Sequence, residues 1–275
     1  MARGLLVAWV VGSTLGSGTF GLPQNMAAGA GAGAIMVGWA ITGVGMLMLA
    51  RVDQTLSRRK PELGNGVYAC ARALSGEYAG FNSAWGYRVS AWIGNVRYLV
   101  AAFGALGCFD PAFGDANTRA AVIGASVVVW VVHALVLRGI QGAAVRNAVL
   151  TLAKVVPLLV FIVLVALAFK AGSFRLDVWR GARLGSVLDQ LKGTMLLTVW
   201  VFIGIESASV YSARARRRQD VGRATVAGFL ICVLLLLLTD SLLSLGIFTQ
   251  PVLAALKNPS MAAVLEGAVG TWARC

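Results

Sequence analysis

The sequence predicts an all-α integral membrane protein with about seven transmembrane helices. Three observations predict this fold class. Of the 275 residues, 58% are apolar and only 13% are charged, whereas about a quarter of the residues in a soluble domain are charged. The mean hydropathy is +0.78. The apolar residues form runs of about 20 residues, which is the length that a helix needs to cross a bilayer.

A hydropathy window of about 19 residues places the spans along the chain. They are predicted at 5–22, 33–50, 79–107, 120–137, 148–169, 193–212 and 226–248. The first segment lacks the small-residue cleavage site of a secretory signal peptide and continues into a glycine-interrupted apolar run. We therefore interpret it as a transmembrane span.

The basic residues predict how these spans are oriented. Clusters of arginine and lysine occur in 51–65, 138–146 and 213–223, after the second, fourth and sixth spans. If the spans alternate, the positive-inside rule assigns all three clusters and the N-terminus to the cytoplasm. The basic segment 170–192 would then lie outside. We expect a multi-pass protein of the inner (cytoplasmic) membrane, with no nucleic-acid partner despite the net charge of +13.

The sequence contains no cluster of residues that indicates catalysis. The single histidine, His133, lies inside the fourth span, and the four cysteines are scattered without metal-ligand spacing. Neither a GxSxG motif nor a P-loop is present. We therefore predict neither an enzyme nor a bound metal or cofactor. An ionisable side chain inside a span leaves a proton-relay role for His133 open.

Glycines interrupt the first predicted span. Gly12, Gly16, Gly18 and Gly21 lie within it and Pro23 ends it, although each glycine costs about 1 kcal/mol in a helix interior. Close packing of a neighbouring helix against these small residues is one explanation. The other is an unwound stretch from Gly16 to Gly18, whose backbone amides and following helix N-terminus face an anionic group.

The sixth predicted span favours the second explanation. Its segment Gly204 to Ser209 places a carboxylate, Glu206, at mid-membrane depth, and a buried carboxylate is costly and therefore usually functional. Two glycine-broken spans at corresponding positions of two halves indicate a transporter binding site. Spans one and six are five apart, as an inverted five-plus-five repeat requires. We thus expect residues 1–170 to form a first repeat and residues 171–275 to begin a second, C-terminally truncated repeat.

Several sequence motifs accompany these breaks. They are GSGTFGLPQNMA (16–27), GWAITGVGMLMLA (38–50), RKPELGNGVYA (59–69), SAWGYRVSAWIGN (83–95), LRGI (137–140) and VWVFIGIESASV (199–210). Together they resemble the amino acid–polyamine–organocation superfamily, and most closely its basic amino acid antiporters of the arginine/ornithine type. The resemblance covers essentially the whole chain. It implies an incomplete five-plus-five inverted-repeat transporter fold, with helices 1 and 6 broken at mid-membrane.

The resemblance also implies roles for residues near the two breaks. Ser17 and Gly18 would hold the substrate carboxylate through backbone amides and a hydroxyl group. Ile203 would offer a carbonyl oxygen to the α-ammonium group, while Trp200 would stack on a cationic side chain. An aromatic belt near the membrane interface is the alternative interpretation of Trp200.

The third predicted span would complete the pocket. By the same resemblance, Ala91 and Asn95 would line its distal part, and Tyr87 would form an inner gate with Glu206. Helical periodicity agrees with this arrangement. At 100° per residue, Tyr87, Ala91 and Asn95 lie on one stripe of the third span that is about 80° wide and also includes Tyr98. One helix face therefore gathers the polar groups.

Two arginines depart from this pattern. Arg88 and Arg97 interrupt the third span, and Arg97 points about 115° away from the centre of the stripe. A lipid-facing arginine costs about 2.5–3.5 kcal/mol or more on insertion scales. The sequence alone assigns Arg97 no function.

The predicted function is the exchange of small basic amino acids across the lipid bilayer by alternating access, as in arginine/ornithine antiport. A lysine or polyamine transporter and an inactive truncated fragment are alternatives that the residues leave open. A channel is a further alternative, although it would be expected to contain a repeated filter loop or rings of charge. A homodimer is compatible with the resemblance.

Overall fold

The computed structural model describes residues 2–60, 63, 66–138, 143–169, 184–207, 215–217, 219–239, 244–257 and 259–270. Within these ranges the chain is helical and contains no strand, in agreement with the predicted all-α class. In the described part of the chain, five helices are long and apolar enough to cross a membrane. The segments Arg3–Thr14 and Gly18–Gly29 meet at an angle of 47° and together form a sixth candidate.

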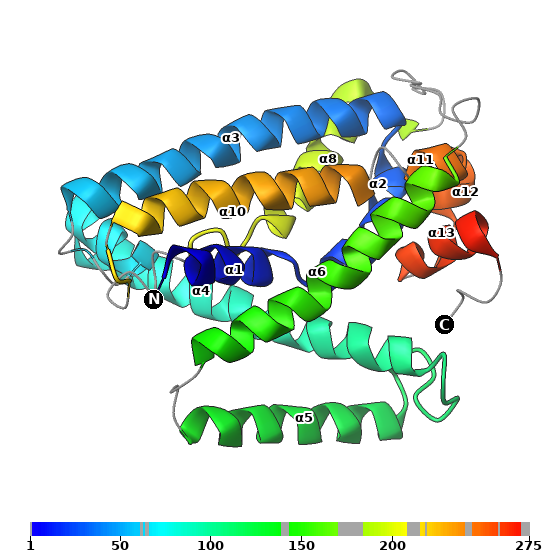
Figure 1. Cartoon of the computed structure of the whole chain (residues 1–275), viewed down its shortest axis with the longest axis horizontal. Coiled ribbons are helices and arrows are strands. Elements are labelled where there is room, and N and C mark those ends of the chain that lie inside the picture. Colours follow the sequence, from blue (N-terminus) through cyan, green and yellow to red (C-terminus); the bar gives the residue numbers. More distant parts are fainter. Residues whose placement is uncertain are drawn as a thin grey trace.

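Figure 1 shows the helices in chain order. They are α1 Arg3–Thr14, the 3-10 helix η1 Ser17–Gly21, α2 Leu22–Gly29, α3 Ala32–Arg59, α4 Gly66–Leu106, α5 Arg119–Leu137, α6 Ala143–Leu167, α8 Val187–Val201, α10 Gln219–Leu237, α11 Ser244–Ile247, α12 Gln250–Ala254 and α13 Ser260–Val269.

Five of the seven predicted spans fall on long helices, α3, α4, α5, α6 and α10, although the helix ends differ. The first and sixth predicted spans fall on the shorter helices α1 and α8. α3 continues past the apolar run to Arg59, and α10 begins earlier than predicted, at Gln219. In both cases a helix continues through a polar segment, because backbone hydrogen bonding does not stop where hydropathy falls. α4 contains one residue with non-helical dihedrals, Gly76, at φ 83°. This break lies just before the predicted start of the third span.

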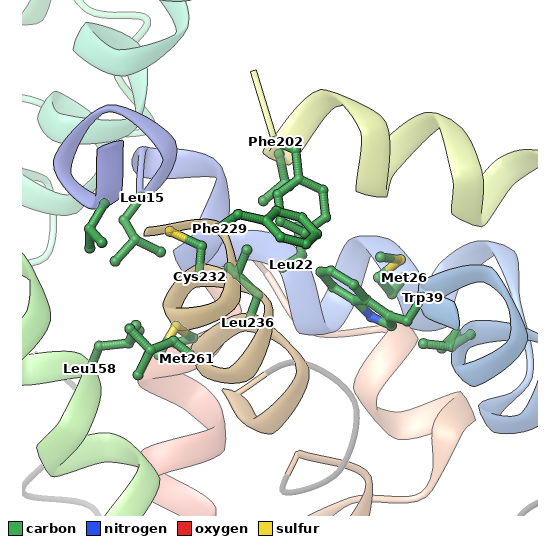
Figure 2. Packing of buried hydrophobic residues seen from close by; sticks show 14 of the residues in the cluster. Leu15, Leu22, Met26, Trp39, Leu158, Phe202, Phe229, Cys232, Leu236 and Met261 are labelled. Carbon is green, nitrogen blue, oxygen red and sulfur yellow. The ribbon is translucent and has the colours of Figure 1, made fainter. Parts of the chain in front are cut away.

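α1, α3, α8 and α10 surround the buried core, with α10 lying between α1 and α3 (Figure 1). Phe202, directly after α8, is fully buried. Its ring centroid lies 5.9 Å from that of Trp39 and 5.3 Å from that of Phe229. Figure 2 shows these three side chains facing one another in the core. Close packing of this kind holds helices together where lipid removes the usual hydrophobic driving force.

Polar side chains also link the helices. Thr42 of α3 and Thr198 of α8 share a buried hydrogen bond of 2.7 Å. The Gln190 side-chain oxygen accepts from the Gly31 backbone N–H at 3.0 Å, which joins the start of α8 to the start of α3. Hydrogen bonds of this kind stabilise helix pairs in apolar surroundings. The end of α8 is thereby held against α3.

α4 and α5 pack differently from this core. Figure 1 shows α5 on the opposite side of the bundle from α3, whereas α4 begins near the end of α3 and runs toward the α5 side. Most of their large apolar side chains are exposed, including Trp92 at 71% and Trp130 at 70%. In a bilayer such faces contact lipid, whereas α4 also turns a second face toward the end of α8.

Candidate functional site

The first site element is the junction between α1 and η1. α1 ends at Thr14, and the next residues are extended, with Gly16 at φ −96° and ψ −175°. The Gly16 N–H donates to the Thr14 carbonyl at 2.9 Å rather than continuing the α-helical pattern. The first backbone N–H groups of a helix have no intrahelical acceptor. The N-terminus of η1 therefore offers amides to an anionic group.

The second site element is the turn that follows α8. Gly204 has φ 114°, a conformation that favours glycine. Its N–H donates to a carboxylate oxygen of Glu206 at 3.0 Å, so the acidic side chain closes the turn. The N–H of Ile203 bonds to the carbonyl of Trp200 at 3.2 Å, in the tighter 3-10 pattern. Helical hydrogen bonding thus changes at the residues that the sequence singles out.

The two elements touch each other through glycines. A Cβ atom added to Gly204 would lie 2.8 Å from the backbone carbonyl of Ser13. A Cβ atom added to Gly18 would lie 2.1 Å from the six-membered ring of Trp200. Real Cβ atoms do not approach other atoms so closely, so a Cβ atom at either position would force its neighbour to shift. That neighbour is the backbone of Ser13 at Gly204 and the far end of the Trp200 side chain at Gly18.

A cavity of about 710 Å³ lies between these two elements and α4. Nine of the residues that the sequence selects line it: Gly16, Gly18, Tyr87, Ala91, Asn95, Trp200, Ile203, Gly204 and Glu206. The backbone of Ser17 is described at the start of η1, whereas its side chain lies outside the described part of the structure. The structure therefore brings three distant segments of the sequence together around one cavity.

Sequence reasoning missed several residues of this site. Ser90 and Arg97 also line the cavity, which shows that the lining face of α4 is wider than the predicted stripe. The guanidinium carbon of Arg97 lies 4.2 Å from the centroid of the Trp200 ring. The prediction that Arg97 points away from the site is therefore wrong for its guanidinium group, because the long side chain reaches across from the flank of the helix. A charged residue inside an apolar span was the available signal.

Lys154 of α6 was also missed. Its Nζ donates to the backbone carbonyl of Gly12 at 3.1 Å. This carbonyl belongs to the last turn of α1, where carbonyls lack intrahelical partners and where positive charge is favourable. Lys154 thus supports the first site element from outside the cavity. Its place within the predicted fifth span was again the signal that sequence reasoning could have used.

The lining of the cavity contains groups of several chemical kinds. Arg97 and Glu206 are the formally charged side chains among its lining residues. Helix-end amides, an aromatic ring and a carboxylate are arranged around one space. In the part of the chain that the structure describes, no group of three or more His, Cys, Asp or Glu side chains is placed to hold a metal ion.

Comparison with known proteins places this all-helical membrane protein in a family. The amino acid permease family model matches residues 5–275. The chain belongs to the amino acid permease family, which confirms the resemblance to the amino acid–polyamine–organocation superfamily. It is accordingly a multi-pass membrane protein of a transporter family rather than an enzyme.

Similar proteins carry names from the same class. The arginine/ornithine antiporter of Pseudomonas aeruginosa is 59% identical over 98% of this chain and 56% of the relative. The L-lysine transport protein of Corynebacterium glutamicum is 51% identical over 97% of this chain and 54% of the relative. The arginine/agmatine antiporter of Chlamydia pneumoniae is 46% identical over 97% of this chain and 56% of the relative. The chain thus spans about half the length of these relatives.

Proposed function

We propose that this chain forms the substrate-binding part of a transporter that exchanges basic amino acids across the membrane by alternating access. The observation that carries the proposal is the cavity of about 710 Å³ that lies between the α1–η1 junction, the turn after α8, and α4. Small-molecule sites usually measure about 300–1,000 Å³. The names of the relatives, an arginine/ornithine antiporter and an arginine/agmatine antiporter among them, support a basic amino acid as the substrate class.

In this proposal the amino acid backbone of the substrate binds at the two helix ends. The carboxylate accepts hydrogen bonds from the backbone amides at Ser17 and Gly18, where the positive end of the helix dipole favours an anion. The α-ammonium group donates to the carbonyl of Ile203, since carbonyls near a helix C-terminus remain available. These two contacts would select an amino acid over a bare polyamine.

The substrate side chain extends toward α4. Trp200 supplies an aromatic face for a cationic group, and Ala91 and Asn95 line the distal part of the pocket. Tyr87 and Glu206 act as an inner gate. Support for a gating role comes from the hydrogen bond between Glu206 and the Gly204 amide, because loss of the carboxylate charge would weaken the contact that closes this turn.

The architecture that we propose for the whole fold is a five-plus-five inverted repeat. Residues 1–170 form the first repeat and residues 171–275 begin the second. About seven spans lie in this chain, and the first span (5–22) and the sixth span (193–212) are broken at mid-membrane. The N-terminus faces the cytoplasm and the protein resides in the inner membrane as a homodimer. Residues 170–183 and 208–214, which carry part of the predicted loop charges, lie outside the described residues.

Vesicle transport tests the function directly. The chain is reconstituted into liposomes loaded with ornithine, and uptake of labelled arginine is measured with and without internal ornithine. Exchange that requires the internal amino acid supports antiport, whereas uptake that is independent of it indicates a channel or a uniporter. Absence of any uptake would favour an inactive fragment.

Lysine is a second candidate substrate, and the 51% identity to an L-lysine transport protein favours it. The same liposomes, loaded in turn with ornithine, lysine or agmatine, separate the candidates. The internal amino acid that gives the fastest exchange identifies the preferred counter-substrate. Equal rates with every internal cation would argue against a specific antiporter.

Cysteine labelling tests the proposed topology. Single cysteines are introduced into 51–65 and 170–192 after replacement of the native cysteines. A membrane-impermeant thiol reagent should reach the second segment and not the first in right-side-out vesicles. Labelling of the first segment from outside would refute the orientation.

A further inference from the structure

Arg97 places a positive charge from the protein inside the proposed substrate cavity. Its guanidinium carbon lies over the Trp200 ring at 4.2 Å from the centroid, well within the distance of about 6 Å at which a cation and an aromatic face attract each other. The two side chains come from α4 and from the end of α8, and both line the cavity. This contact therefore joins two walls of the site.

Trp200 is held in place on a second side. Its six-membered ring lies against Gly18, so closely that an added Cβ atom there would lie 2.1 Å away. The edge of the Trp200 ring thus packs against the backbone of η1, and the guanidinium group of Arg97 lies over its face. The aromatic face that a cationic substrate would use is already in contact with a cation.

The charge of the cavity supports this interpretation. The carboxylate of Glu206 accepts a hydrogen bond from the Gly204 amide at the turn. Among the described residues, no carboxylate forms an ion pair with Arg97. A guanidinium group is a cation, so a second cation at Trp200 would meet like charge.

We propose that Arg97 is a specificity-determining residue that acts as a tethered competitor for cationic substrate side chains. This inference rests on the proposed function of the cavity. A substrate with a charged side chain reaches Trp200 only when Arg97 has left the ring. A neutral substrate of the same shape places no charge at Trp200, so the guanidinium group of Arg97 does not repel it. Arg97 therefore lowers the preference of the site for cationic over neutral side chains.

Arginine and citrulline provide the test, because the ureido group of citrulline is a neutral isostere of the guanidinium group. Binding of both is measured on the purified chain in lipid nanodiscs, for the native protein and for Arg97→Gln. The substitution should raise arginine affinity by roughly twofold to thirtyfold, the range of a cation–π contact. Citrulline affinity should stay within about twofold, so the ratio of the two affinities reports the charge effect.

Three further variants separate charge from packing. Arg97→Met, which keeps an apolar stem, repeats the neutral substitution in case Arg97→Gln does not fold. Arg97→Lys keeps the charge and should leave the arginine-to-citrulline ratio within about threefold of the native value. Arg88→Gln is the matched control on the same helix, at a position that does not line the cavity, and should leave the ratio unchanged.

The outcomes distinguish this inference from the function on which it rests. A rise in the ratio for both neutral variants, with no rise for Arg97→Lys, supports the tethered competitor. An unchanged or lowered ratio, in variants that still bind amino acids, overturns the role of Arg97 and leaves the proposed function standing. Failure of the native chain and all variants to bind either compound overturns both.

Discussion

The two interrupted helix ends are held open in different ways. After α8, the turn is stabilised largely by its own residues: Gly204 adopts φ 114°, and the carboxylate of Glu206 accepts from the Gly204 amide. After α1, the N-cap residue of η1 is Gly16, which has no side chain that could cap the helix. That junction instead depends on partners from elsewhere, such as Lys154 of α6. The comparison indicates that the second break is encoded locally and the first is imposed by tertiary contacts.

The largest expected effect comes from breaking the locally encoded turn. Gly204→Ala forces an L-residue into a strained backbone conformation, at a cost of about 1–3 kcal/mol, and brings a Cβ atom to 2.8 Å from the Ser13 carbonyl. We expect a clear loss of thermal stability, measured as the temperature at which monodisperse protein disappears in size-exclusion chromatography. Gly193→Ala is the control, because a Cβ atom added at that position in α8 would meet no described neighbour within 4 Å apart from its own helix backbone. Equal melting of the two variants would contradict the argument.

The next largest effect is expected at Trp200, whose ring lies between the two helix ends. Trp200→Leu removes a cation–π contact of about 0.5–2 kcal/mol and should weaken arginine binding by up to roughly thirtyfold. The loss should be larger in an Arg97→Gln background, because there the substrate alone occupies the ring. Direct binding measurements on the two single variants and the double variant give this coupling. Strict additivity would show that Arg97 and the substrate do not share Trp200.

A smaller effect is expected from a substitution at the junction between α1 and η1. Gly18→Ala places a methyl group 2.1 Å from the Trp200 ring, and overpacking of this kind costs about 1–3 kcal/mol. The obstacle is the far end of a side chain, which can move, so we expect roughly tenfold weaker arginine binding with little loss of stability. Gly43→Ala in α3, which has open space around it, serves as the control. Destabilisation as severe as that of Gly204→Ala would remove the distinction between the two breaks.

The smallest effect on binding is expected at Glu206. Glu206→Gln retains an oxygen that can accept from the Gly204 amide but removes the charge. Equilibrium arginine binding should stay within about threefold, while the rate of exchange or its dependence on pH should change. Binding isotherms and exchange rates at several pH values test this. If the substitution abolishes binding outright, Glu206 is a direct substrate ligand rather than a gating residue.

Much of the arrangement could be predicted because it follows from local patterns. Apolar runs located α3, α5 and α6, since hydropathy and helix length are properties of short segments. Helical periodicity placed Tyr87, Ala91 and Asn95 on one face of α4, and they do line one cavity. The prediction was less accurate at helix ends such as Arg59, where polar residues continue the helix without a hydropathy signal.

The sequence by itself determined the membrane class and the approximate spans, because composition and periodicity are local properties. Only the tertiary structure decided which charged side chains contact the ends of α1 and α8. Arg97 reaches Trp200, and Lys154 reaches Gly12, from helices distant in the chain. Such contacts depend on side-chain length and on the distance between packed helices, and a helical wheel contains neither quantity.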